Sequence, residues 1–206
     1  QQKIKESSQK RDMMIAQRRE ILLGTNQYPN FSEVIEKELP DGLFTRQDSS
    51  KEEIIAEPLH PYRGAQAFEL LRYTTDKFSK NNPRPKVFMI PMGNLNMRKA
   101  RARFACNFFA CAGFEVVDNI GFKTVIEAVA AAKKAKANIV VVCSSDDEYA
   151  TIVPEINKQL GNDAILVVAG APACMDDLKA QGIENFVHVK VNVLEELRSY
   201  QGLLGI

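Results

Sequence analysis

The feature that most constrains the fold of this chain is a regular alternation of short apolar segments and longer amphipathic segments from residue 86 to residue 206. The pattern predicts strands at 86–90, 114–118, 138–143, 164–168 and 185–189. It predicts helices at about 97–112, 122–136, 147–160, 173–182 and 192–204. The third and fourth strands are continuously apolar, which is typical of parallel strands that are covered on both faces. Right-handed crossovers of this length predict a flavodoxin-like α/β domain, a five-stranded parallel sheet of order 2-1-3-4-5 with helices on both faces.

Residues 1–85 read as a helical and extended N-terminal arm that precedes the α/β domain of residues 86–206. Residues 1–23 are charged and helix-prone, and Gly24 is expected to end this helix. Residues 24–63 are rich in Pro, Asn and Gly, which indicates an extended connection with at most a short helix at 32–38. The connection also contains the aromatic residues Tyr28, Phe31, Phe44 and Tyr62. Disordered segments are poor in aromatic residues, so we expect the connection to lie along its own domain or along a partner. A further helix is predicted at 64–80, and a chain that begins within a helix is expected to be part of a longer protein.

The composition excludes several functional classes. A net charge of +1 over 206 residues gives no basic stripe for nucleic acid. No apolar run reaches the roughly 20 residues that a membrane-spanning helix needs, and the first residues are too polar for a signal peptide. The four cysteines, Cys106, Cys111, Cys143 and Cys174, show no metal-ligand spacing. We therefore expect a cytoplasmic protein with reduced thiols, without a membrane or nucleic-acid partner.

The loop that follows the first predicted strand is the place where an open α/β sheet usually holds a ligand. Residues 91–101 contain no carboxylate, no histidine and no phosphate-binding glycine series. The polar side chains of this loop are Asn94, Asn96, Arg98, Lys99 and Arg101. The sequence thus indicates a ligand-binding fold that has lost the chemistry of its site.

Residues 112–116, 142–145 and 166–170, read within the βα array, resemble the cobalamin-binding domain of methylmalonyl-CoA mutase. Residues 24–30 resemble the connector between the substrate barrel and the cobalamin-type domain in the small subunits of heterodimeric bacterial mutases. The resemblance covers essentially the whole chain, as the C-terminal portion of a small subunit without its barrel.

The resemblance implies a degenerate cofactor site. In catalytic members the loop carries Asp-x-His-x-x-Gly, in which the histidine is the lower cobalt ligand and the aspartate holds its other ring nitrogen. These three positions fall on Asn96, Arg98 and Arg101. Ser144 and Ser145 stand near the family serine beside the nucleotide tail, and Gly170 retains half of a Gly-Gly pair, so these residues are weak remnants.

By resemblance, the chain is expected to be a non-catalytic module that binds no cofactor or metal and stabilises a heterodimer. The large subunit would hold adenosylcobalamin, and the whole enzyme would isomerise methylmalonyl-CoA and succinyl-CoA by a radical route. Two alternatives remain. The chain could be a corrinoid carrier without a histidine ligand, using Ser144, Ser145 and Gly170, or a flavodoxin-like domain that binds another ligand.

The cations Arg98, Lys99, Arg101 and Arg103 are predicted near a helix N-terminus, where positive charge is unfavourable. They indicate an acidic partner or an anion, or else side chains whose stems pack on the sheet while their heads stay in water.

The remaining candidate residues are interpreted as structural. Asp146 is expected to be a helix N-cap, with Asp147 and Glu148 in the first turn. His60, in a Pro-flanked loop, and His188, on the last predicted strand, have no ligand cluster nearby in the sequence. Cys106 and Cys111 are interpreted as buried small apolar groups.

Overall fold

The computed structural model describes residues 2–35 and 63–206. Its centre is one parallel sheet of five strands in the order β2-β1-β3-β4-β5. The strands are β1 (Lys86–Pro91), β2 (Glu115–Val117), β3 (Ile139–Cys143), β4 (Ile165–Ala169) and β5 (Asn185–Val187). The predicted sheet and its order are confirmed, and β3 is buried along its whole length as its apolar sequence indicates.

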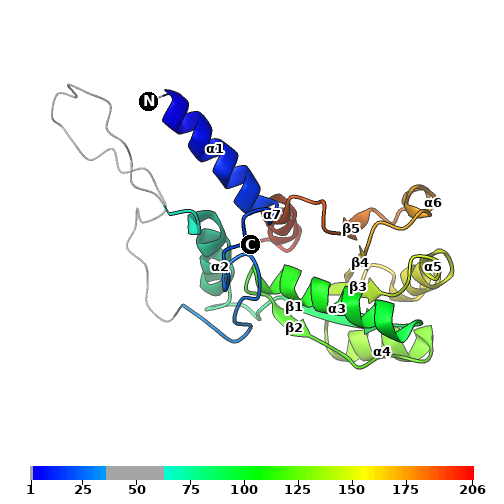
Figure 1. Cartoon of the computed structure of the whole chain (residues 1–206). Helices are drawn as coiled ribbons and strands as arrows, with labels where there is room; N and C mark the ends of the chain where they lie inside the picture. The colour runs from blue at the N-terminus through cyan, green and yellow to red at the C-terminus, as the bar shows by residue number, and fades with distance from the viewer. Residues whose placement is uncertain (1, 36–62) are drawn as a thin grey trace, which may run out of the picture.

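Seven helices are described: α1 (Gln2–Ala16), α2 (Gln66–Phe78), α3 (Leu95–Ala110), α4 (Val125–Lys134), α5 (Tyr149–Leu160), α6 (Met175–Ala180) and α7 (Val193–Leu203). Alternate strand side chains point to opposite faces, so the sheet separates two apolar cores. One core lies under α3 and α7 and includes residues of α2 and the last turn of α1. The other lies under α4, α5 and α6. Figure 1 shows this layered arrangement.

Asparagine and threonine caps set the start of three helices. The side-chain oxygen of Asn94 accepts hydrogen bonds from the backbone N–H groups of Asn96 and Met97 at the start of α3. Thr124 and Asn192 cap α4 and α7 in the same way. The prediction that Asp146 caps α5 was wrong. The N-cap is Glu148, and Asp146 lies in the preceding turn, where it pairs with Arg101.

The first helix ends earlier than predicted, at Ala16 and not near Gly24. The chain turns at Arg18, whose φ is 57°. The fully buried side chain of Asn26 holds this turn: it accepts from the N–H of Leu22 and donates to the carbonyls of Ile15 and Glu20. Most of α1 projects away from the sheet (Figure 1), and only its last two residues, Ile15 and Ala16, are buried.

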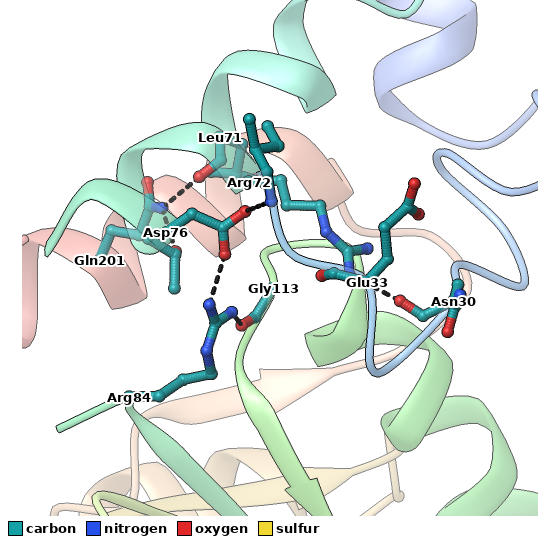
Figure 2. A network of polar contacts seen from close by, with 10 residues as sticks. Asn30, Glu33, Leu71, Arg72, Asp76, Arg84, Gly113 and Gln201 are labelled. Carbon is teal, nitrogen blue, oxygen red and sulfur yellow. Dashed lines mark hydrogen bonds and ion pairs between the residues drawn. The ribbon is translucent and has the colours of Figure 1, made fainter. Parts of the chain in front are cut away.

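A polar network joins the arm and α2 to the amino edge of the sheet (Figure 2). One nitrogen of the Arg72 guanidinium donates to the carbonyls of Asn30 and Glu33, both at 2.6 Å. Asp76, buried on α2, accepts from the N–H of Ile35 and pairs with Arg84, which also donates to the carbonyl of Gly113. The network fastens residues 30–35 to the turns that precede β1 and β2.

Several predictions fall on residues that the structure does not describe. Phe44, His60 and Tyr62 lie outside the described residues, as do residues 36–38 of the short helix predicted at 32–38, and residues 32–35 are not helical. Tyr28 and Phe31 are about half exposed, at 49% and 47%.

Candidate functional site

The carboxyl edge of the sheet brings together the loops after β1, β2, β3 and β4, as the sequence predicts for a ligand-binding α/β fold. Asn96, Arg98 and Arg101 lie on the first turns of α3, above this edge. Ser144 and Ser145 follow β3, and Gly170 follows β4. The six residues named by the resemblance therefore converge on one edge.

Arg98 contacts the two loops that follow β1 and β2. One of its terminal nitrogens donates to the carbonyl of Gly93 at 3.2 Å. Its guanidinium also packs on Gly121, where an added Cβ would be 2.9 Å from the Arg98 Cζ atom. A side chain at position 121 would collide with the guanidinium, so the absence of one gives Arg98 its place.

Arg101 does the same at the other side of the edge. It pairs with Asp146 across 2.8 Å and lies over Gly170, where a Cβ would be 3.2 Å from the Arg101 Cζ atom. Its side chain is only 25% exposed. The two interpretations of these cations were contact with an acidic partner or anion, and heads that stay in water. The Arg101 head instead pairs with Asp146 of the same chain, and the guanidinium groups of Arg98 and Arg101 both pack on a glycine.

Glu148 lies between the loops that follow β1 and β3, although its sequence position predicted only a residue in the first turn of a helix. Its carboxylate accepts from the hydroxyls of Ser144 and Ser145 and from the N–H groups of Ser145 and Asn94. The carboxylate also lies against Gly93, whose φ is +68° and where a Cβ would be 2.1 Å from the Glu148 oxygens. Both serine hydroxyls are therefore occupied by the chain's own carboxylate.

The hydrogen bonds from Ser144 and Ser145 lower the pKa of the Glu148 carboxyl from 4.5 to about 2. Because the folded pKa is depressed, the contribution of this group to stability is present above pH 4.5 and is lost as the pH falls toward 2.

We expect Glu148→Gln to lower the free energy of unfolding by about 1 kcal/mol at pH 7, since a charge-assisted acceptor becomes a neutral one at a site that solvent reaches. The difference from the wild type should shrink as the pH falls from 4.5 toward 2. Urea unfolding at pH 7, 4 and 2.5 measures it. A constant difference across this range would mean that the serine contacts do not lower the pKa of the Glu148 carboxyl. Glu155→Gln, which alters an exposed carboxylate on α5, is the control.

The histidine and cysteine candidates take no part in these contacts. His188 follows β5 and is not within it, and burial lowers the pKa of its imidazole. Burial raises the pKa of the Cys106 thiol to about 12 and that of Cys143 well above its usual value. Within residues 2–35 and 63–206, no group of three or more histidine, cysteine, aspartate or glutamate side chains could hold a metal ion. In the same part of the chain, no helix has both the length and the apolar character needed to cross a membrane.

No family model matches the chain. Over all of its 206 residues, however, it is 51% identical to the methylmalonyl-CoA mutase small subunit of Porphyromonas gingivalis (strain ATCC BAA-308 / W83). The chain belongs to the family of methylmalonyl-CoA mutase small subunits. The family predicted from the sequence motifs is thus confirmed. The match covers 32% of the P. gingivalis protein, so the chain spans about a third of that relative's length.

More distant small subunits also match. The chain is 30% identical over 208 residues to the probable methylmalonyl-CoA mutase small subunit of Mycobacterium bovis, with 98% of this chain and 31% of the relative covered. It is 30% identical over 161 residues to the small subunit of Streptomyces virginiae, with 75% of this chain and 24% of that protein covered. Among solved structures, a cobalamin-binding protein from Desulfitobacterium hafniense DCB-2 matches with 23% identity and a TM-score of 0.43, over 66% of this chain and 67% of that chain.

The side chains at the carboxyl edge do not fit a histidine-ligated corrinoid. By the resemblance, Arg98 is at the position of the ligand, and a guanidinium has five donors and no lone pair for cobalt. Asn96 is neutral where an aspartate would orient the ligand. Arg101 fills the space above Gly170 that a bound group would need. We therefore derive no reaction step through such a cofactor.

Proposed function

We propose that this chain is the non-catalytic, cofactor-free part of a mutase small subunit, with a structural and interaction role. The observation that carries the proposal is the filled carboxyl edge. Arg98, Arg101 and Glu148 pack on Gly121, Gly170 and Gly93, and they occupy the space where an α/β fold of this kind would hold a ligand. In this proposal the chain supplies no catalytic residue.

The proposed partner is the large, catalytic subunit, which would hold adenosylcobalamin in a cytoplasmic heterodimer. The whole enzyme would interconvert methylmalonyl-CoA and succinyl-CoA. The relatives are named small subunits, which supports a second and larger chain. The exposed apolar side chains of the arm, among them Leu23, Tyr28 and Phe31, are suitable for a protein interface. We further propose that residues 1–85 are the connector and residues 86–206 the cobalamin-type domain at the C-terminal end of the subunit.

The alternative is a corrinoid carrier that binds cobalamin without a histidine ligand. It would need the hydroxyls of Ser144 and Ser145 for the nucleotide tail, yet both donate to Glu148. It would also need the surface of Gly170, which Arg101 covers. Binding would require the charged side chains of Glu148 and Arg101 to leave their contacts, so we favour the cofactor-free role.

The test is a titration of the purified chain with hydroxocobalamin and adenosylcobalamin, followed by visible absorbance and calorimetry. We expect no saturable binding up to about 500 μM. A Kd of 1 mM would correspond to only about −4 kcal/mol of binding free energy, so this range would detect all but very weak binding. Arg98→His should also fail to bind, because Asn96 and Arg101 still deny orientation and close approach. The large subunit of a mutase of this family serves as the positive control. Saturable binding with a shifted spectrum, by the wild type or by Arg98→His, would contradict the proposal.

A further inference from the structure

A cavity lies on the opposite side of α3 from the filled carboxyl edge. It has a volume of about 510 Å³ and is walled by the arm, by α3 and by the turn between β5 and α7. Pockets that bind small molecules usually measure about 300 to 1,000 Å³. Ala100, Arg103 and Phe104 line it from α3. At helical spacing these three share one face, while Arg98 and Arg101 lie on another, so the cavity is separate from the edge that those arginines fill.

The charge of the cavity wall is one-sided. Arg18 and Arg103 line it together with His188, and no aspartate or glutamate is among its lining residues. Arg103 makes no ion pair with any described carboxylate; its guanidinium lies 5.8 Å from the centre of the Tyr28 ring. The Nε of Arg18 is buried without a hydrogen-bond partner among the described residues, while one of its terminal nitrogens donates to the carbonyl of Asn107 and to the Sγ of Cys111. These cations would attract a negatively charged group, and a guanidinium can bind a carboxylate or phosphate with two hydrogen bonds.

The rest of the wall is apolar or aromatic. Phe104 is partly buried at the edge of the core under α3, Val193 is buried at the start of α7, and Tyr28 lines the cavity from the arm. A flat apolar group would bury surface against these side chains. The cavity thus combines an apolar wall with convergent cationic donors, the combination found in sites for organic anions.

We propose that this cavity binds a small organic anion in which a carboxylate, sulfonate or phosphate is joined to a flat apolar body. Arg103, with Arg18, binds the anionic group, while Phe104 and Tyr28 contact the body. The site is built jointly by the arm and the α/β domain, so an occupant would couple the two. The inference is independent of the cofactor-free edge, because no residue is shared.

The experiment uses 8-anilinonaphthalene-1-sulfonate as the probe, since it carries one sulfonate on a flat aromatic body and fluoresces when bound. Titration of the purified 206-residue chain should give one site per chain. Arg103→Gln should weaken binding at least tenfold. Lys99→Gln is the matched control, because it removes the same charge from the same helix outside the cavity wall, and it should change the affinity less than twofold.

A variant that leaves every charge in place keeps the test independent of electrostatics and of folding. Ala100→Phe adds a ring at a helix surface position that lines the cavity, and it should abolish binding while the circular dichroism and melting temperature stay unchanged. Inorganic pyrophosphate should displace the probe, whereas sodium chloride at equal ionic strength should do so far less. Equal effects of Arg103→Gln and Lys99→Gln, several weak sites per chain, or full binding by Ala100→Phe would overturn the proposal. Cobalamin binding, tested separately, bears only on the filled edge.

Discussion

Replacing Asp76 with alanine is expected to lower the free energy of unfolding by about 3 kcal/mol, because loss of one member of a buried ion pair leaves the other charge without compensation. The Asp76 side chain is 3% exposed, and its two oxygens serve different parts of the chain. One accepts from the N–H of Ile35 in the arm, and the other pairs with Arg84 just before β1. In the variant the Arg84 guanidinium, 23% exposed, loses its counter-charge and keeps only the carbonyl of Gly113, and the Ile35 N–H loses its acceptor.

For a chain of this size, 3 kcal/mol corresponds to a fall in melting temperature of about 6 to 12 °C. Urea unfolding followed by circular dichroism measures the change in free energy directly. Asp163→Ala is the matched control, since Asp163 also pairs with a cation, Lys133, at 2.9 Å but is 63% exposed. It should cost less than about 0.5 kcal/mol, as exposed ion pairs do. Equal losses in the two variants would show that the network in Figure 2 contributes no more than a surface pair.

The sheet could be predicted because its signal is local and repeated. Each βα unit carries its own apolar strand and its own helix periodicity, and the strand order follows from the handedness of the crossovers. The element limits were accurate for β3 and β4 to within one residue, since 139–143 and 165–168 are apolar without interruption. The outer strands β2 and β5 contain only three residues each and were each predicted two residues too long, β2 by one residue at either end and β5 at its C-terminal end.

The candidate site was predictable only in part. The proposed loss of the ligand motif at Asn96, Arg98 and Arg101 could be inferred from the sequence, because it concerns which chemical groups are present. The contacts that replace the motif depend on which loops meet in space, and no local pattern reveals that Arg101 reaches Asp146 or that Glu148 reaches Asn94. One signal was available for Glu148: it follows Ser144 by four residues and Ser145 by three, which permits serine-to-carboxylate hydrogen bonds across one turn.

The end of α1 was missed for a related reason. Gly24 is a legitimate helix terminator, but the actual end is set by Asn26, whose side chain satisfies backbone groups at three points of the preceding turn. Propensity favours a continued helix through residues 17–23, and a buried side-chain contact overrides it. Sequence patterns describe what a segment prefers by itself, whereas this turn exists because its asparagine is buried against the end of the helix.

Asn26→Ala should therefore destabilise the chain by about 2 to 3 kcal/mol, since removal of the buried amide leaves the part-buried N–H of Leu22 and carbonyl of Glu20 without their partner. The loss should be local as well as global. Hydrogen exchange should accelerate at residues 15–28 more than in the sheet, because the turn is held by one fully buried side chain.

Asn30→Ala is the matched control in the same segment: the Asn30 side chain also makes two hydrogen bonds, both to Ser32, but both are exposed. It should change the free energy of unfolding by less than about 0.5 kcal/mol. If exchange in β1 and β3 rose as much as in the turn, Asn26 would support the whole core and not the junction between α1 and the connector. Local acceleration alone would instead identify Asn26 as the residue that fixes the angle at which the projecting helix leaves the domain.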